Sequence, residues 1–336
     1  MNAQHRLAIE HHTVTTPDGW TLELRRGRGA NGPVNGMPVL FVHGYGMNAH
    51  LFHAHPTGPS FFDVLMEHGL DPWAVDLRGT KTSEAPHAWS AVRLADIAFK
   101  DVPASIDHVR AVTGRDRIHA IGVSLGGGAL YAHVGRDAHH IDRLVTMGSP
   151  LVWQDRGAVL WTFGALGPAL SRIPLRGTTQ AARAVLPLAR RLGPKAVGFY
   201  VNPEITDTLH PETLLRTIED PHPDVSASLS RWIRQRHLVL AGHHVTHGLK
   251  AFGRPTLAVY AEGDGVCPPA AARAVLDYTG GPVDTLAIDD GPNRVSHVDL
   301  FAAHFAPERV FPPVARWLAG PEPTLQPAAT RPRGSR

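Results

Sequence analysis

Cysteine is almost absent from the chain, and so are long apolar runs. The single cysteine among 336 residues, Cys267, leaves no pair for an internal disulfide, which excludes a disulfide-rich scaffold and a structural zinc site built from several cysteines. No run of about 18 uncharged apolar residues occurs, so no transmembrane helix is expected. Because residues 1–20 carry charged and histidine side chains in place of an apolar core, they do not resemble a secretory signal. We therefore expect a cytoplasmic location.

A strong excess of charge is also missing. The formal net charge is only +3 at pH 7. Proteins that bind nucleic acid typically present a basic stripe interleaved with aromatic residues, and the chain has no such stretch, so no nucleic-acid partner is expected. Hydrophobic residues make up 43% of the chain, which is enough for a buried core and excludes a generally disordered protein.

Short apolar runs alternate with helical stretches along most of the chain. Residues 13–26 predict a β-hairpin that turns at Pro17-Asp18-Gly19, because Asp-Gly tolerates the positive φ of a tight turn. A helix is predicted at 95–112, where apolar residues keep helical spacing. The other apolar runs predict strands that are buried on both faces, as in a parallel sheet covered by helices; they are 38–43, 72–77, 117–123, 141–147, 255–261 and 283–288. This alternation predicts a doubly wound α/β fold.

One long interval interrupts the alternation. Residues 151–250 look mostly helical, and a hundred residues is too long for an ordinary connection. We predict a helical cap or lid there, inserted between two parts of the core at residues 1–150 and 251–320. A C-terminal helix is predicted at 307–318 and a disordered tail at 321–336. Four aromatic residues of the cap are candidates either for an acyl pocket or for the cap's own core: Trp153, Trp161, Phe163 and Trp232.

The sharpest local motif is Gly122-Val123-Ser124-Leu125-Gly126. It lies directly after a predicted strand and before a predicted helix, which is the context of a nucleophile elbow. In such an elbow the serine sits on a strained turn, and small residues on either side avoid clashes with that turn. The alternative is a tight turn with an ordinary serine. We predict that Ser124 is a nucleophile.

A second loop, His43-Gly44-Tyr45-Gly46, follows the predicted strand 38–43. Loops at the carboxyl ends of parallel strands line the ligand crevice of such sheets. The backbone N–H groups of Tyr45 and Leu125 are therefore candidates for an oxyanion hole, since two fixed donors would stabilise the charge of a tetrahedral intermediate. Taken alone, the same loop fits a simple glycine turn.

A base and an orienting acid follow in the order that a serine nucleophile on this kind of sheet requires. Asp264 comes after the strand 255–261, and His297 comes after the last strand. A histidine would take the proton of Ser124, and a carboxylate would fix the tautomer of that histidine and stabilise its charged form. We favour Asp264 as the acid. The alternative carboxylates are Glu262, Asp289, Asp290 and Asp299.

Together these segments resemble the α/β-hydrolase superfamily over about residues 13–320. The resemblance lies in HGYG at 43–46, DLRG at 76–79, GVSLGG at 122–127, EGD at 262–264 and SHVDL at 296–300. Within the superfamily, residues 101–108 and the loops of the three candidate catalytic residues look most like a bacterial lipase-like group related to polyhydroxyalkanoate synthases and depolymerases. The resemblance implies a mostly parallel eight-stranded sheet, a helical cap, the triad Ser124, Asp264 and His297, and no cofactor.

Two positions depart from this group. Its polymer synthases carry a cysteine in the elbow where this chain has Ser124, so polymer-granule synthesis is not expected. The loop after Asp76 has the sequence DLRGTKTSE in place of the family's DLRGHGxS, so no role is carried over to it.

Histidine clusters suggest a metal site, but their spacing does not support one. His243 and His247 would share one helical face, as zinc ligands do. His244, however, occupies the position of the glutamate in H-E-x-x-H, and no third ligand is marked. We expect neither a metal nor another cofactor.

The leading functional hypothesis is a serine hydrolase, similar to carboxylesterases and lipases, that forms an acyl-enzyme on Ser124. Its expected partner is a small-molecule ester with a fairly apolar acyl group. The alternatives are an acyltransferase or polyhydroxyalkanoate-related enzyme of the same fold and a non-hydrolytic small-molecule binder, because a fold does not fix a reaction. The sequence predicts neither the acyl-chain length nor the oligomeric state.

Overall fold

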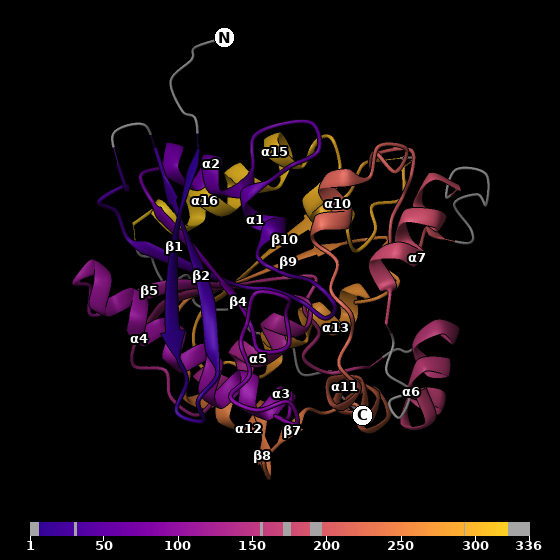
Figure 1. The fold of residues 1–336 in the computed structure, drawn as a ribbon, viewed down its shortest axis with the longest axis horizontal. Helices are drawn as coiled ribbons and strands as arrows, with labels where there is room; N and C mark the ends of the chain where they lie inside the picture. Colours follow the sequence, from indigo (N-terminus) through magenta and orange to yellow (C-terminus); the bar gives the residue numbers. More distant parts are fainter. Residues whose placement is uncertain are drawn as a thin grey trace, which may run out of the picture.

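A mixed β-sheet runs through the centre of the structure (Figure 1). The computed structural model describes residues 7–29, 32–154, 157–170, 176–188, 197–291 and 293–321. The eight strands of the sheet have the order β1-β2-β4-β3-β5-β6-β9-β10. Their bounds are β1 Ala8–Thr15, β2 Thr21–Arg28, β3 Pro38–Val42, β4 Asp71–Asp76, β5 Ile118–Val123, β6 Ile141–Met147, β9 Thr256–Ala261 and β10 Val283–Ile288. Only β2 pairs antiparallel with its neighbours β1 and β4, and all other pairs are parallel. The predicted fold class is therefore confirmed.

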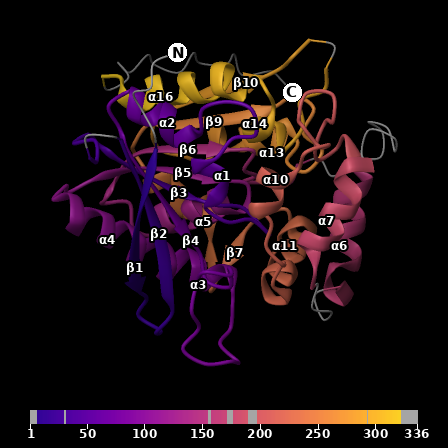
Figure 2. The same cartoon turned by 45° about the horizontal axis from the view of Figure 1, so that its top comes forward.

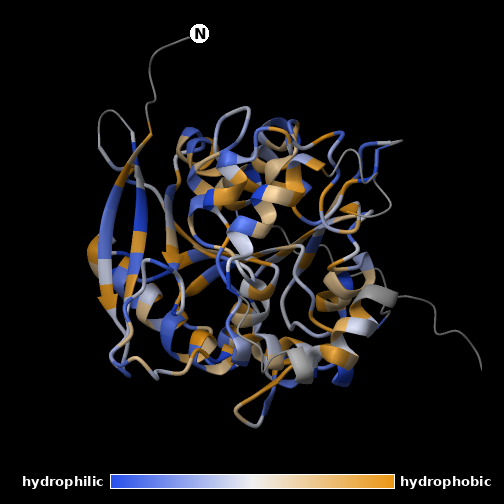
Figure 3. Cartoon of the chain, turned by 45° about the vertical axis from the view of Figure 1, so that its right-hand side comes forward, coloured by the Kyte–Doolittle hydropathy of each residue, from blue (hydrophilic) through white to orange (hydrophobic). Residues whose placement is uncertain are grey.

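The N-terminal hairpin lies at one edge of the sheet and faces water. Strands β1 and β2 pair from Ala8 opposite Arg28 to Thr15 opposite Thr21, around the predicted turn at Gly19, whose φ is +87°. Most residues of β1 are exposed or half-buried, and the hairpin is largely hydrophilic in Figure 3. By contrast, every residue of β3, β4, β5 and β9 is buried, as expected for strands covered on both faces. The same prediction is wrong for β10, because it lies at the other edge of the sheet and only Ile288 is buried.

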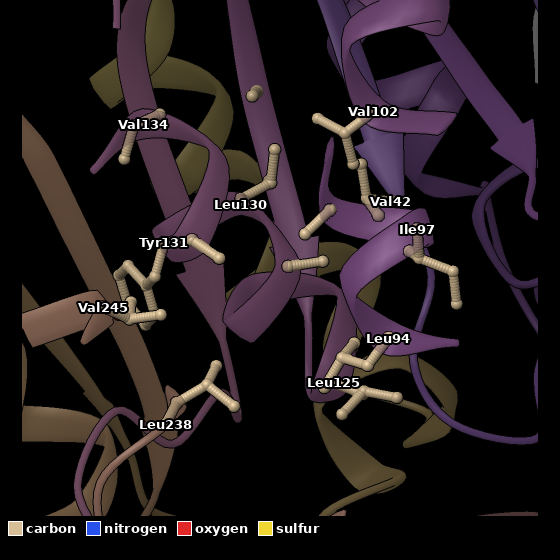
Figure 4. Packing of buried hydrophobic residues seen from close by; sticks show 14 of the residues in the cluster. Val42, Leu94, Ile97, Val102, Leu125, Leu130, Tyr131, Val134, Leu238 and Val245 are labelled. Atoms are coloured by element: carbon tan, nitrogen blue, oxygen red, sulfur yellow. The ribbon is translucent and has the colours of Figure 1, made fainter. Parts of the chain in front are cut away.

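Helices cover both faces of the sheet (Figure 2). One face packs against α2 (Phe61–Glu67), α14 (Asp299–Ala302) and α16 (Phe311–Ala319). The other packs against α3 (Leu94–Asp96), α4 (Val102–Thr113), α5 (Leu125–Val134) and α13 (Pro269–Arg273). Figure 4 shows part of this second core, in which Leu130 of α5 lies between Val42 of β3 and Val134. The core places the start of α5 at the carboxyl end of β5.

Two predicted helices differ in detail from the structure. The helix predicted at 95–112 is present, but a π-helical segment, Ile97–Asp101, joins α3 to α4. The single helix predicted at 307–318 is wrong, because α15 (Ala306–Arg309) ends before Val310 and α16 starts at Phe311. Prolines occupy the first turn of α16; since proline lacks the N–H that a continuous helix would use, a new helix begins there.

The chain between β6 and β9 is mostly helical within its described residues. It holds α6 (Ala158–Leu170), α7 (Thr178–Val185), α10 (Glu212–Arg216), α11 (Pro223–Gln235) and α12 (Val245–Gly248), with short 3₁₀ segments at Leu186–Leu188 and Leu249–Ala251 and a small hairpin of β7 (Val239–Leu240) and β8 (His243–His244). Figure 1 shows α6 beside α11 and α7 beside α10, to one side of the sheet. The division of the chain into core and cap at residues 151 and 250 stays a prediction.

The remaining short elements are α1 (His50–His53), between β3 and α2, and a 3₁₀ segment at Ala274–Asp277 after α13. Residues 322–336, which make up nearly all of the predicted tail, lie outside the described residues. Within the described part of the chain, each helix is too short or too polar to span a membrane.

Candidate active site

Ser124 lies on a sharp turn between β5 and α5. Its φ of 52° and ψ of −119° place a non-glycine residue in a sparsely populated region, which costs on the order of 1–3 kcal/mol. The flanking glycines make this turn possible. A Cβ on Gly122 would lie 2.5 Å from the Cα of Gly127, and a Cβ on Gly126 would lie 2.2 Å from the carbonyl oxygen of Val42. The turn therefore projects the serine at the carboxyl end of the sheet.

The loop 43–48, which follows β3, passes directly against Ser124. A Cβ on Gly44 would lie 2.9 Å from the Cβ of Ser124. His43 is buried within this loop, where its Nε2 accepts the N–H of Leu77 at 3.1 Å and its Nδ1–H donates to the carbonyl of Gly44 at 2.9 Å. Burial lowers the pKa of His43, so this histidine stays neutral and holds the loop in place.

Glu219 fixes the other end of the same loop. Its carboxylate accepts the side-chain amide of Asn48 at 2.6 Å and the backbone N–H of Lys81 at 3.2 Å. Its own N–H donates to the carbonyl of Gly46 at 2.9 Å. Glu219 thus connects the loop 43–48 to Lys81 through one set of hydrogen bonds. The sequence gives no sign of these contacts, because no motif marks a glutamate whose partner lies 171 positions away in the chain.

Asp264 and His297 lie side by side. The Nδ1–H of His297 donates to Oδ2 of Asp264 at 2.6 Å, and both side chains are buried. The second oxygen of Asp264 accepts the backbone N–H groups of Val266 at 2.8 Å and Cys267 at 2.7 Å, so the carboxylate is fully held in position. Two of the alternative carboxylates bind other partners: Asp290 binds Arg309 and Asn293, and Asp299 binds backbone and hydroxyl donors described below.

The loop of His297 is anchored by Asp299, which sequence analysis named only as an alternative acid. Its buried carboxylate accepts the N–H groups of Ser296 at 2.7 Å and Asn202 at 3.1 Å and the hydroxyl of Thr206 at 2.8 Å. Burial raises the pKa of Asp299 to about 6. These contacts fasten residues 202–206 to the histidine loop.

A glycine sets the position of the His297 ring from the opposite side. Gly148, directly after β6, has a φ of +55°, and a Cβ there would lie 3.0 Å from Cε1 and 3.1 Å from Nδ1 of His297. The imidazole therefore packs on bare backbone. This glycine could not be identified from the sequence, since nothing in its local sequence indicates which side chain lies against it.

Ser124 and His297 line the same cavity, which we call the first cavity and which has a volume of about 260 Å³. Tyr45 and Leu125 also line it, and no described residue accepts their backbone N–H groups. The remaining walls are mainly apolar, formed by Met47, Pro150, Trp153, Leu160, Phe163, Phe199, Tyr200, Leu229, Trp232, Ile233, Gly265, Val266 and Cys267.

The aromatic candidates of the predicted cap separate into two groups. Trp153, Phe163 and Trp232 line the first cavity, whereas Trp161 is 62% exposed and does not. Cys267 lines the cavity but is buried, and this burial raises its thiol pKa well above the ordinary value. A thiol of this kind is a poor nucleophile.

The histidine-rich segment at β8 and α12 lies apart from these residues. His243, His244 and His247 are exposed, and the rings of His244 and His247 stack at 5.0 Å. Among the residues that the structure describes, no group of three or more histidine, cysteine, aspartate or glutamate side chains is arranged to hold a metal ion.

The alpha/beta hydrolase fold family matches residues 37–279. The chain belongs to this family. The match includes Ser124, the loop 43–48 and Asp264 and ends before His297. The finer likeness to polyhydroxyalkanoate-related enzymes stays a prediction.

Similar curated proteins are lipases. The chain is 31% identical over 130 residues to triacylglycerol lipase 2 of Arabidopsis thaliana, which covers 35% of this chain and 31% of that protein. It is 29% identical over 153 residues to lipase 1 of Drosophila melanogaster, which covers 43% of this chain and 34% of that protein. The matched part thus spans about a third of the length of these relatives.

Solved structures share the fold over nearly the whole chain. An esterase from Exiguobacterium antarcticum has a TM-score of 0.62 at 17% identity, covering 93% of this chain and 100% of that one. A thermophilic esterase from Thermogutta terrifontis has a TM-score of 0.59 at 18% identity, covering 92% and 98%. At these identities the likeness concerns the fold alone.

Proposed function

We propose that the protein is a serine hydrolase that cleaves a carboxylic ester with an apolar acyl group. The observation that carries the proposal is the first cavity itself. One apolar space contains a strained serine, a histidine whose Nδ1–H is bound by a buried carboxylate, and two backbone donors that no described residue occupies. The lipase relatives and the family support the same class of reaction.

In the proposed reaction Ser124 attacks the ester carbonyl and His297 takes its proton. Because Asp264 accepts Nδ1–H, Nε2 is left to accept the proton of the serine, and the carboxylate stabilises the ring when it becomes charged. The N–H groups of Tyr45 and Leu125 would hold the oxyanion of the tetrahedral intermediate. His297 then gives the proton to the leaving alcohol, and a water that it activates releases the acid from the acyl-enzyme.

The apolar walls of the first cavity favour an acyl chain over a polar or charged group. An apolar cavity of about 150 Å³ holds one benzene, which has six carbons. By that proportion, the first cavity of about 260 Å³ holds roughly ten carbons. We therefore propose acyl chains of medium length as the preferred substrates.

A fluorophosphonate probe and a series of p-nitrophenyl esters test the proposal together. The probe is expected to label Ser124, and hydrolysis is expected to increase with acyl length up to roughly ten carbons. Ser124→Ala should abolish labelling and nearly all turnover, because binding alone does not replace the nucleophile. The absence of both labelling and hydrolysis in folded wild-type protein would refute the proposal. Adding alcohol or thiol acceptors separates hydrolysis from acyl transfer: an acyltransferase would form new esters in place of free acid.

A further inference from the structure

A second cavity lies beside the first. Its volume is about 230 Å³, similar to that of the first. Its described lining is formed by Met47, Ala182, Val185, Leu186, Val197, Phe199, Tyr200, Val201, Leu214, Thr217, Ile218 and Val298. None of these side chains is charged. Nothing in the proposed reaction so far uses this space.

The two cavities share a wall and have separate roofs. Met47, Phe199 and Tyr200 line both of them. The first cavity lies under α6 and α11, and the second under α7 and α10, the two helix pairs that stand apart in Figure 1. Val298 lines the second cavity and directly follows His297, which lines the first. The second cavity therefore adjoins the first on the side of His297.

The proposed reaction indicates which part of the ester the second cavity could bind. An ester has two arms, and the arm that leaves is the alcohol, whose oxygen must receive a proton from His297. The acyl carbon stays bonded to Ser124, beside the N–H groups of Tyr45 and Leu125 in the first cavity. The alcohol arm must consequently extend from the carbonyl past the histidine, towards the cavity that begins at Val298.

We propose that the second cavity binds the alcohol arm of the ester and that this arm is an unbranched aliphatic chain. The inference rests on the proposed ester hydrolysis. Two hydroxyls belong to the described lining, those of Thr217 and Tyr200. That of Thr217 is already used, because it donates to the carbonyl of Leu214 at 2.7 Å. A sugar or a charged alcohol would lose more hydrogen bonds to water than these two hydroxyls could replace. An apolar cavity of about 150 Å³ holds the six carbons of a benzene, so by the same proportion the second cavity, at about 230 Å³, holds roughly nine carbons.

Hexanoate esters of methanol, butanol, hexanol and octanol test the inference, with the release of hexanoic acid as the readout. The acyl arm is constant in this series, so only the alcohol arm changes. For the wild type, kcat/KM is expected to rise with alcohol length by up to about fourfold for each added methylene. A flat or falling series in an enzyme that does cleave these esters would overturn the inference.

A variant whose new side chain fills the second cavity provides the second measurement. Ala182→Phe, on the half-buried face of α7, places a phenyl ring in the second cavity, whereas the matched control Ala181→Phe changes an exposed neighbour on the same helix. We expect Ala182→Phe to lower the octyl-to-methyl ratio of kcat/KM at least fivefold and to leave methyl hexanoate within about twofold of the wild type. Ala181→Phe should keep the wild-type ratio.

The outcomes separate this inference from the proposed function. An unchanged ratio in folded Ala182→Phe, shown by its circular dichroism, would exclude the second cavity as the alcohol site. Should Ala182→Phe not fold, the wild-type series alone decides. If no ester is cleaved and the fluorophosphonate does not label Ser124, the ester proposal itself fails, and this inference fails with it.

Discussion

Glu219 offers the sharpest test of how the site is held together. Its buried carboxylate binds Asn48 at 2.6 Å and Lys81 at 3.2 Å, and its N–H binds Gly46 at 2.9 Å. These contacts fix the loop that carries Tyr45, one of the two proposed oxyanion donors. Glu219→Gln keeps the shape of the side chain but removes its charge, and it turns an NH₂ group towards one of the two donors. We therefore expect the variant to fold, with the loop 43–48 shifted and the backbone N–H of Tyr45 displaced.

The expected loss follows from the strength of these contacts. A hydrogen bond to a charged group contributes about 1.5–3 kcal/mol, and about 1.4 kcal/mol corresponds to a tenfold change in rate. The loss should not exceed that of a missing oxyanion donor, about 10²–10³-fold in kcat. We expect kcat of Glu219→Gln to fall by about 10- to 100-fold, with KM changed by less than about twofold, because the interaction acts on the transition state.

Steady-state hydrolysis of p-nitrophenyl hexanoate, together with a thermal melt, measures this effect. Glu212→Gln is the matched control, since Glu212 makes an ion pair with Arg183 at 2.9 Å in which both side chains are more than half exposed. Such a pair contributes about 0–1 kcal/mol, so its kcat should stay at the wild-type value. Three results would contradict this prediction: a wild-type kcat in Glu219→Gln, a change in KM alone, or a loss of activity that equals the fraction of unfolded protein.

Two further predictions concern the histidine side of the site. Gly148→Ala should lose at least tenfold in kcat, because its Cβ meets the ring of His297 at 3.0 Å. Gly114→Ala is the matched control, because it carries the same backbone strain of about 1–2 kcal/mol but its added Cβ has no atom within 4 Å. Equal losses of activity in the two variants would contradict this prediction. Burial raises the pKa of Asp299 from its ordinary value of 3.8 to about 6 in the folded protein. Its stabilising contribution is therefore complete below the unfolded pKa and is lost as pH rises through 6. Urea unfolding should therefore show Asp299→Asn gaining about 2 kcal/mol relative to the wild type between pH 4 and pH 7. A constant difference would show that the pKa is not raised.

The parts of the site that could be predicted from sequence are those with a local signature. Ser124 lies in a glycine-flanked box between a strand and a helix, and Asp264 and His297 each follow a strand, so chain order and motif context indicated all three. The structure brings the last two together at 2.6 Å. The hairpin and the buried strands were predictable for the same reason, because alternation and turn residues are local patterns.

The parts that could not be predicted depend on contacts between distant segments. Asp299 and Glu219 look like ordinary acidic residues in the sequence, and their roles come from partners 93 and 171 positions away. Trp161 has the same side chain as Trp153 and Trp232, yet it is exposed while they line the first cavity. Which face of a helix is buried depends on how that helix packs, and a single sequence does not contain that information for a segment without clear periodicity.

The segment between β6 and β9 acts on the site in two physically different ways. Its helix pairs supply the roofs of both cavities, so substitutions there change which ester arms fit and should appear in KM or in length preference. Its residues 217–219 instead bond to the backbone of the loop 43–48, through Thr217 to Asn48 and Glu219 to Gly46. Substitutions at those positions move a proposed donor, which acts on the transition state. Exchanging the whole segment for that of a relative would therefore alter rate and selectivity together. Changes confined to the residues of α7 and α10 that line the second cavity, Ala182, Val185 and Leu214, should alter selectivity alone.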